Sequence, residues 1–289
     1  MTRRQAYVSM PGSKGVRNKM KVFVIDLSIC NGCYSCQIAC KDEHVSNDWT
    51  PYAKPQPDTG QFWVKILEEV RGTVPKVRVA YRPHLCMHCD EAPCIPACRR
   101  NAIYKREDGI VIIDPEKCAG HRNCIDACPY GVIYFNEDLN IAQKCTSCAH
   151  LLDNGWSKPR CADVCPTEAI KFGEESEFTD LIAGGAEVIS PELGLKPRVY
   201  YLNIMKRFVA GTVYDPEQKE VVIGAICTLT DTRSSEKLTV STDNFGDFWF
   251  KDLPDNAGYN LQIQKDGRAK TIENISTGKD INLGDIPLI

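Results

Sequence analysis

Short apolar runs separated by polar turns recur along the 289-residue chain, but their pattern changes near Phe208. Before it, paired runs flank acidic turns, as in NAIYKREDGIVIIDPEKC (101–118) and PYGVIYFNEDLNIAQKC (129–145), which predicts short hairpins. After it, apolar and polar positions alternate, and turns rich in Gly, Asp and Asn separate the runs. These runs are AGTVYD (210–215), VIGAICTLTD (222–231), LTVSTDN (238–244), FGDFWFKDL (245–253), YNLQIQKDG (259–267) and KTIENIS (270–276). The pattern predicts an all-β sandwich of about seven strands over residues 208–289, immunoglobulin-like or transthyretin-like (carboxypeptidase-regulatory-like).

Composition places the chain among soluble globular proteins, with 43% apolar and 25% charged residues. The net charge of −3 does not favour a nucleic-acid partner. The longest apolar runs, such as VVIGAICTL from Val221, are much shorter than the roughly 20 residues of a membrane helix. We therefore expect no membrane span and no nucleic-acid partner.

The first nineteen residues are basic and contain no Asp or Glu. Their Thr2-Arg3-Arg4 start resembles a twin-arginine signal, but no apolar segment and no cleavage site follow. We interpret residues 1–19 as a flexible basic extension, or as sequence upstream of a native start at Met20. A cytoplasmic location is expected, with periplasmic co-export alongside a partner as the alternative.

Fifteen of the sixteen cysteines lie in four runs with the spacing of ferredoxin-type iron–sulfur ligands. The runs are Cys30–Cys40 (C-x2-C-x2-C-x3-C), Cys86–Cys98 (C-x2-C-x4-C-x3-C), Cys118–Cys128 (C-x2-H-x2-C-x3-C) and Cys145–Cys165 (C-x2-C-x12-C-x3-C). Three close cysteines wrap one cluster, and the fourth ligates the cluster of a partner run. Zinc ribbons have no use for that fourth cysteine, so iron–sulfur clusters are the favoured interpretation.

Because similar hairpins separate the runs, the chain reads as two ferredoxin modules, one nested inside the other. This predicts an α+β, double-ferredoxin-like domain over residues 20–207, with four cluster sites. The predicted ligand sets are Cys30, Cys33, Cys36 and Cys165; Cys40, Cys145, Cys148 and Cys161; Cys86, Cys89, Cys94 and Cys128; and Cys98, Cys118, His121 and Cys124. Cys227 lies in an apolar run and is predicted to be a buried strand residue rather than a ligand.

His121 stands where the other runs have a second cysteine. Imidazole replaces thiolate on iron in Rieske centres, so a 4Fe–4S cluster with His121 as one ligand is the favoured hypothesis. Because a neutral ligand leaves the cluster less negative, its reduction potential should be higher. A 3Fe–4S cluster with His121 unbound, or an empty site, are the alternatives. The other three clusters are expected to be 4Fe–4S with cysteine ligands only.

Four ferredoxin runs in this order resemble the iron–sulfur electron-transfer subunits of the dimethyl sulfoxide reductase superfamily of molybdenum or tungsten bis-pyranopterin enzymes. The resemblance covers residues 20–206 and includes SPELGLKPRVYY (190–201). Segments such as YRPHLCMHCDEAPC (81–94) are most similar to the small subunits of transhydroxylases, which also end in a β-sandwich. In those subunits the third run has lost its ligands, whereas here Cys98, Cys118, Cys124 and Cys128 are all present.

The resemblance implies a non-catalytic subunit that relays electrons between a large catalytic partner and an external electron donor or acceptor. The molybdenum or tungsten cofactor is expected only in that partner. The Cys30/Cys33/Cys36/Cys165 cluster would lie nearest the partner's cofactor, and the His121 cluster nearest the external redox protein. Analogy suggests hydroxylation, dehydroxylation or hydroxyl transfer on phenolic rings. The alternatives are a respiratory sulfoxide, polysulfide or formate enzyme subunit, or a stand-alone polyferredoxin.

The sequence offers no catalytic site of its own, since neither a nucleotide-binding loop nor a recognisable catalytic triad is present. Four histidines stand beside the cysteine runs, namely His44, His84, His88 and His150. We expect these side chains to form hydrogen bonds that tune the clusters rather than to act as catalytic bases.

Overall fold

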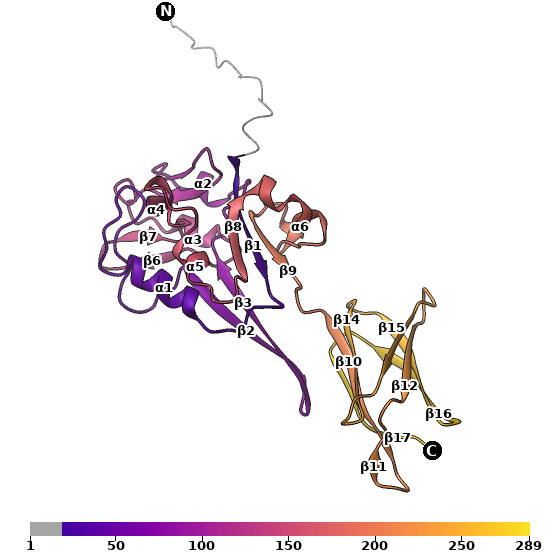
Figure 1. The fold of residues 1–289 in the computed structure, drawn as a ribbon. Helices are drawn as coiled ribbons and strands as arrows, with labels where there is room; N and C mark the ends of the chain where they lie inside the picture. Colours follow the sequence, from indigo (N-terminus) through magenta and orange to yellow (C-terminus); the bar gives the residue numbers. More distant parts are fainter. Residues whose placement is uncertain (1–18) are drawn as a thin grey trace, which may run out of the picture. The chain divides into compact units, whose positions relative to one another are not determined.

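The computed structural model describes residues 19–289, which form two compact units (Figure 1). The first unit consists of the described residues up to Leu67 and of Tyr81–Ile204, and the second of Glu68–Ala80 and Met205–Ile289. Apart from Lys19, the expected basic extension and its Thr2-Arg3-Arg4 start lie outside the described residues. The sequence predicts a domain boundary after residue 207, with Glu68–Ala80 in the first domain, whereas the packing groups that segment with the second unit.

A three-stranded sheet joins the beginning and the end of the first unit. Its central strand β1 (Lys21–Asp26) pairs antiparallel with β8 (Ile170–Glu174) and parallel with β9 (Val199–Leu202). Four consecutive residues of β1, Val22–Ile25, are buried, because this strand is covered on both faces.

Two short hairpins lie where the sequence predicts them, between the cysteine runs. Strands β4 (Ile103–Lys105) and β5 (Val111–Ile113) pair antiparallel, as do β6 (Tyr134–Asn136) and β7 (Ile141–Gln143). Gly109, at φ +85°, supplies the left-handed conformation that the first of these turns requires.

The helices of the first unit are short, and all except α6 contain or directly follow a cysteine of the four runs. They are α1 (Ser35–His44), α2 (Cys94–Ala97), α3 (Asn123–Asp126), α4 (Ala149–Asp153), α5 (Arg160–Asp163) and α6 (Thr179–Ala183), with 3-10 turns η2 (Glu175–Phe178) and η3 (Pro191–Leu193). Among the described residues, no helix has the length and apolar character that crossing a membrane requires.

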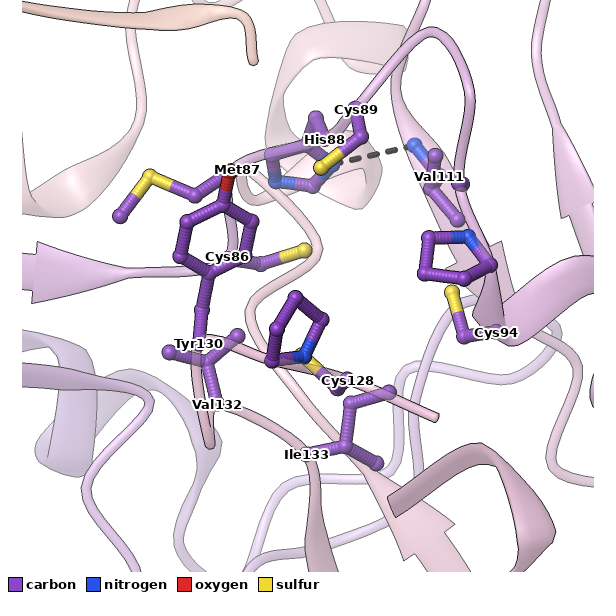
Figure 2. Close-up of a pocket in the computed structure, with 13 residues that line it drawn as sticks. Cys86, Met87, His88, Cys89, Cys94, Val111, Cys128, Tyr130, Val132 and Ile133 are labelled. Carbon is purple, nitrogen blue, oxygen red and sulfur yellow. Dashed lines mark hydrogen bonds between the residues drawn. The ribbon is translucent and has the colours of Figure 1, made fainter. Parts of the chain in front are cut away.

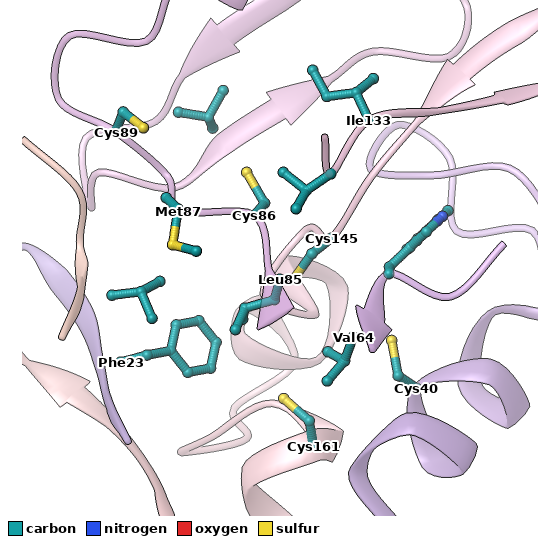
Figure 3. Packing of buried hydrophobic residues seen from close by; sticks show 14 of the residues in the cluster. Phe23, Cys40, Val64, Leu85, Cys86, Met87, Cys89, Ile133, Cys145 and Cys161 are labelled. Atoms are coloured by element: carbon teal, nitrogen blue, oxygen red, sulfur yellow. The ribbon is translucent and has the colours of Figure 1, made fainter. Parts of the chain in front are cut away.

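The core of the first unit mixes apolar side chains with cysteine thiols. Figure 3 shows the sulfur atoms of Cys40, Cys86, Cys145 and Cys161 among side chains that include Phe23. These four cysteines are therefore held by the packed interior of the unit.

The second unit contains two four-stranded sheets. One consists of β10 (Arg207–Asp215) with β11 (Glu220–Val221), β14 (Asp247–Leu253) and β17 (Ile281–Pro287); the other has the order β13 (Lys237–Ser241), β12 (Ile226–Asp231), β15 (Gly258–Lys265), β16 (Arg268–Ser276). The eight strands, rather than about seven, include the two-residue β11 and the C-terminal β17. Alternate residues of β14 and β15 enter a core that also buries Cys227, as predicted for that residue.

The hairpin of β2 (Val64–Thr73) and β3 (Lys76–Leu85) contributes its outer part, Glu68–Ala80, to the second unit. Arg71 forms a two-pronged ion pair with Asp280, Nε–Oδ2 2.7 Å and Nη2–Oδ1 2.9 Å. Lys76 is 4% exposed and pairs with Asp247. These buried ion pairs explain why the tip of the hairpin belongs to the sandwich unit.

Candidate iron–sulfur cluster sites

The cysteines of the four runs come together in three sets of four and one set of three. Thiols of one set lie close enough for each negative charge to raise the pKa of its neighbours. We number the sets as sites. Site 1 is Cys30, Cys33, Cys36 and Cys165; site 2 is Cys40, Cys145, Cys148 and Cys161; site 3 is Cys86, Cys89, Cys94 and Cys128; site 4 is Cys98, Cys118 and Cys124.

Site 1 is formed by the loop of the first run, the start of α1 and Cys165, which lies two residues after the end of α5. Burial, and then the charges of Cys165, Cys30 and Cys33, raise the pKa of Cys36 to about 12. Gly32 has φ +66° and lies against the ring of Tyr81, so a side chain there would collide with the ring. Only glycine allows the loop to approach this closely.

Site 2 is the most deeply buried. Its four cysteines are only 4–5% exposed, although Cys40 comes from α1 and Cys161 from α5. Helices α1 and α5 pack against each other, which brings the first and fourth runs together. Burial, followed by the neighbouring thiols, raises the pKa of Cys40 and of Cys161.

Site 3 surrounds a cavity. Figure 2 shows the sulfur atoms of Cys86, Cys89, Cys94 and Cys128 around one common space. The other walls of the cavity are mainly apolar, for example Val111. Burial raises the pKa of Cys89 and of Cys94 to about 12.

Site 4 brings Cys98, Cys118 and Cys124 together, and burial followed by the other two thiols raises the pKa of Cys124 to about 11. His121 lies in the exposed turn between Cys118 and α3, where its carbonyl oxygen accepts a hydrogen bond from the Asn123 N–H (2.9 Å). Within residues 19–289, the imidazole of His121 forms no hydrogen bond with the three sulfur atoms.

The loops of sites 1 and 4 share one backbone conformation. Gly32 and Gly120 have φ values of +66° and +72°, and Tyr34 and Arg122 have φ values of 62° and 61°. Between these paired positions stand Cys33 in one loop and His121 in the other. His121 therefore occupies the position equivalent to Cys33, which is itself exposed.

The four sites follow one another in space. Charge interactions link Cys36 of site 1 to Cys40 of site 2, Cys145 of site 2 to Cys86 of site 3, and Cys94 of site 3 to Cys124 of site 4. Exposed residues are found in the loops of the two end sites, Cys33 in one and His121 in the other. The arrangement is a row with a buried middle and two ends at the surface.

The residues present fit iron–sulfur clusters. Sulfur is the donor that such clusters select, and every cysteine of the row is a free thiol. Backbone N–H groups point at sulfur atoms, from Ser147 to Cys145 (3.3 Å) and from Ala102 to Cys98 (3.3 Å), as required to stabilise negative charge. Within residues 19–289, no three His, Cys, Asp or Glu side chains converge closely enough for a single metal ion.

The histidines lie next to the cysteine row, as expected. His44 is buried between Trp63 and His150, and burial followed by the charge of His150 lowers its pKa to about 3; its Nε2 lies 3.9 Å from the sulfur of Cys148. Nε2 of His150 contacts Glu43 (2.9 Å).

His88 and His84 contact the backbone. The Val111 N–H donates to Nδ1 of His88 (3.0 Å), so Nε2 carries the proton and donates to the hydroxyl of Ser147 (2.9 Å). Nε2 of His84 contacts the carbonyl oxygen of Tyr130 (2.8 Å). One neighbour that the sequence did not single out is Lys144, which is buried directly before Cys145. Its only sequence signal was its place between an apolar strand and a cysteine run.

The fold and these sites define a ferredoxin-type iron–sulfur protein with an appended β-sandwich. Two family models match accordingly: a 4Fe-4S dicluster domain over residues 77–175 and a carboxypeptidase regulatory-like domain over residues 209–288. They confirm a ferredoxin-type 4Fe–4S domain and a carboxypeptidase-regulatory-like β domain, while the four-cluster arrangement stays a prediction.

The pyrogallol hydroxytransferase small subunit of Pelobacter acidigallici is 42% identical over 274 residues, which is 92% of this chain and 98% of that one. One sulfite dehydrogenase subunit, from Allochromatium vinosum, is 35% identical and covers 62% of this chain and 81% of its own. The arsenate respiratory reductase iron–sulfur subunit of a Shewanella species is 32% identical, covering 62% of this chain and 94% of its own. The chain belongs to the family of iron–sulfur electron-transfer subunits of the dimethyl sulfoxide reductase superfamily, as its sequence predicted.

Proposed function

We propose that this chain relays electrons through four clusters held at sites 1 to 4, between the metal–pterin centre of a catalytic partner and an external redox partner. The observation that carries the proposal is the single row of four thiol sets, buried in the middle and exposed at both ends. Clusters bound there would supply one-electron carriers. The chain's own residues hold the sulfur ligands in place and keep water away from site 2, whose four cysteines are buried.

We infer that site 1 faces the catalytic partner. Cys33 is exposed, and three large apolar side chains near it in the sequence are exposed as well: Ile29 (42%), Tyr34 (37%) and Ile38 (60%). Exposed apolar side chains next to a redox site favour a protein–protein contact. The large partner is expected to hold molybdenum or tungsten, as the family resemblance implies.

Hydroxyl transfer or hydroxylation of phenolic rings is the overall chemistry that we propose for the complex. It rests on the 42% identity with a pyrogallol hydroxytransferase small subunit, which extends through the β-sandwich. A respiratory oxidoreductase is the second candidate, because the sulfite dehydrogenase and arsenate reductase relatives match over 62% of the chain. The sandwich is proposed to have a docking or structural role.

We propose that His121 is the fourth ligand at site 4, since it takes the position of Cys33 in a loop of the same backbone conformation. A cluster of three irons without His121, or an empty site, remain the competing hypotheses. The neutral imidazole would raise the potential of a cluster at site 4 relative to all-cysteine ligation.

Metal analysis of the anaerobically purified complex tests the proposal. Four cubane clusters require roughly 16 iron atoms and 16 acid-labile sulfides per chain. Stoichiometric zinc without labile sulfide would refute cluster binding. Co-purification separates the remaining possibilities: a large pterin-containing chain supports an enzyme subunit, and a loaded monomer supports a stand-alone polyferredoxin. Assays of the complex with phenols and with sulfur or arsenic oxyanions then distinguish the two chemistries.

A further inference from the structure

Lys144 is a buried cation without a carboxylate partner. Its side chain is 2% exposed, and its ammonium group donates to two carbonyl oxygens, that of Val111 and that of Cys145 (3.0 Å). Among the ion pairs formed within residues 19–289, none includes Lys144. Lysine is rarely buried unless an anion accompanies it, because desolvating an ammonium group is costly and carbonyl dipoles offset only part of that cost.

The two carbonyl groups place this cation between sites 2 and 3. Cys145 is a member of site 2, and Val111 lines the cavity of site 3. The single ammonium group thus contacts the backbone of one residue at each of the two sites.

Other polar groups packed near Lys144 do not provide a counter-charge. His88, whose Nδ1 accepts a hydrogen bond from the Val111 N–H, is buried, and burial together with the charge of Lys144 lowers its pKa and keeps it neutral. The small cavity beside Lys144 is lined by apolar and neutral polar groups and by Lys54, without a carboxylate.

We propose that Lys144 is the shared counter-cation of the clusters at sites 2 and 3, and that it raises the reduction potential of both. The inference rests on the proposed function, since the anion that explains the buried lysine is the thiolate-ligated cluster on either side of it. A fixed positive charge favours the reduced, more negative state of each cluster. Removing it should make both clusters harder to reduce.

Lys105 provides a matched control. It is a lysine of the same unit and also acts on His88, but its ammonium group is paired with Asp90 (3.0 Å). Asp90 keeps two further hydrogen bonds from Arg198, each 2.7 Å, when Lys105 is removed. Lys105→Met therefore deletes one lysine charge that already has its own counter-ion.

The test compares Lys144→Met, Lys105→Met and the wild-type protein, each as the intact complex purified without oxygen. Iron and labile sulfide are counted first, and the midpoint potentials are then measured by redox titration monitored by electron paramagnetic resonance. We expect Lys144→Met to shift two of the midpoint potentials to more negative values and the remaining ones much less. Lys105→Met should leave all of them close to the wild-type values.

Unchanged potentials in a fully loaded Lys144→Met protein, or an equal shift of every cluster, would overturn the inference. If Lys144→Met fails to assemble, Lys144→Arg and Lys144→Gln decide the question. If Lys144→Arg has full iron content and Lys144→Gln does not, a positive charge is needed at this position. If Lys144→Gln has full iron content, or if both variants lack it, the inference is overturned. A wild-type protein without labile sulfide would overturn the proposed function itself, which is a different result.

Discussion

The Arg71–Asp280 ion pair should dominate the attachment of the hairpin tip to the sandwich unit. Asp280 is 5% exposed, and besides its two hydrogen bonds from Arg71 it accepts one from the Phe208 N–H (3.2 Å). The hydrogen bond with Asp280 also raises the pKa of Arg71, so the guanidinium remains charged at any working pH. In Asp280→Asn, the amide NH₂ would face a guanidinium N–H donor, and one of the paired hydrogen bonds would be lost.

Breaking a buried ion pair by removing one partner costs about 3–5 kcal/mol. Because Arg71 is 15% exposed and keeps a hydrogen bond to the Met205 carbonyl oxygen (2.7 Å), the lower end of that range applies. A loss of about 3 kcal/mol corresponds to a decrease of roughly 100-fold in the equilibrium between closed and open states. Amide hydrogen exchange of β10 and β17 in the full chain measures this directly, since exchange there requires local opening.

Glu69→Gln is the matched control, because Glu69 contacts the same arginine (3.5 Å) but is 53% exposed. Such a surface pair contributes at most about 1 kcal/mol, so amide protection should fall less than about tenfold. If Asp280→Asn lowers protection no more than Glu69→Gln does, the reasoning from burial is wrong. A loss of protection in β1 and β8 of equal size would instead indicate a global effect.

Three further outcomes are expected. His121→Cys should retain the iron content and lower the reduction potential of the site 4 cluster. His121→Ala should lose roughly one iron per chain and give the paramagnetic signal of a three-iron cluster. The same signal in fresh wild-type protein would show that His121 is not a ligand. Removing Met205–Ile289 should leave the iron content unchanged, because every cysteine of the four sites precedes it, and loss of a whole cluster would contradict the independence of the two units. Cys227 should resist alkylation at pH 8 in the folded protein, since it is 0% exposed and burial raises its pKa to about 12. Mass spectrometry that finds Cys227 labelled without unfolding would contradict this prediction.

Much of the fold was predictable because its signals are local. The hairpins β4–β5 and β6–β7 follow from two apolar runs around an acidic turn, and the strands of the sandwich follow from alternation. The grouping of cysteines across runs stays a prediction, taken from the ferredoxin rule that the fourth cysteine of a run ligates the cluster of a partner run. The structure brings the corresponding thiols near one another, with Cys40 beside Cys145 and Cys165 beside Cys36.

The missed features depend on partners that are distant in sequence. Nothing in the strand VKILEEVRGT indicates that Arg71 is to meet Asp280, more than two hundred residues later. Lys144 was overlooked for a related reason: lysine in a sequence reads as a surface residue, and burial becomes plausible only when two anionic sites flank it. The sequence shows that His121 stands at an unusual position. Only the backbone of the structure shows that the loops of Gly32 and Gly120 have the same conformation.

The nesting of the sites has a consequence for assembly. Site 1 combines the first run with Cys165 of the fourth, and site 2 combines the fourth run with Cys40 of the first. Strand β1 precedes the first run, and its partner strand β8 follows the fourth. Sites 3 and 4 consist only of residues 86–128, which lie between the first and the fourth run. Where a site is assembled from distant segments, binding free energy becomes folding free energy. Cluster binding at sites 1 and 2 should therefore close the whole unit, while binding at sites 3 and 4 stabilises its central part.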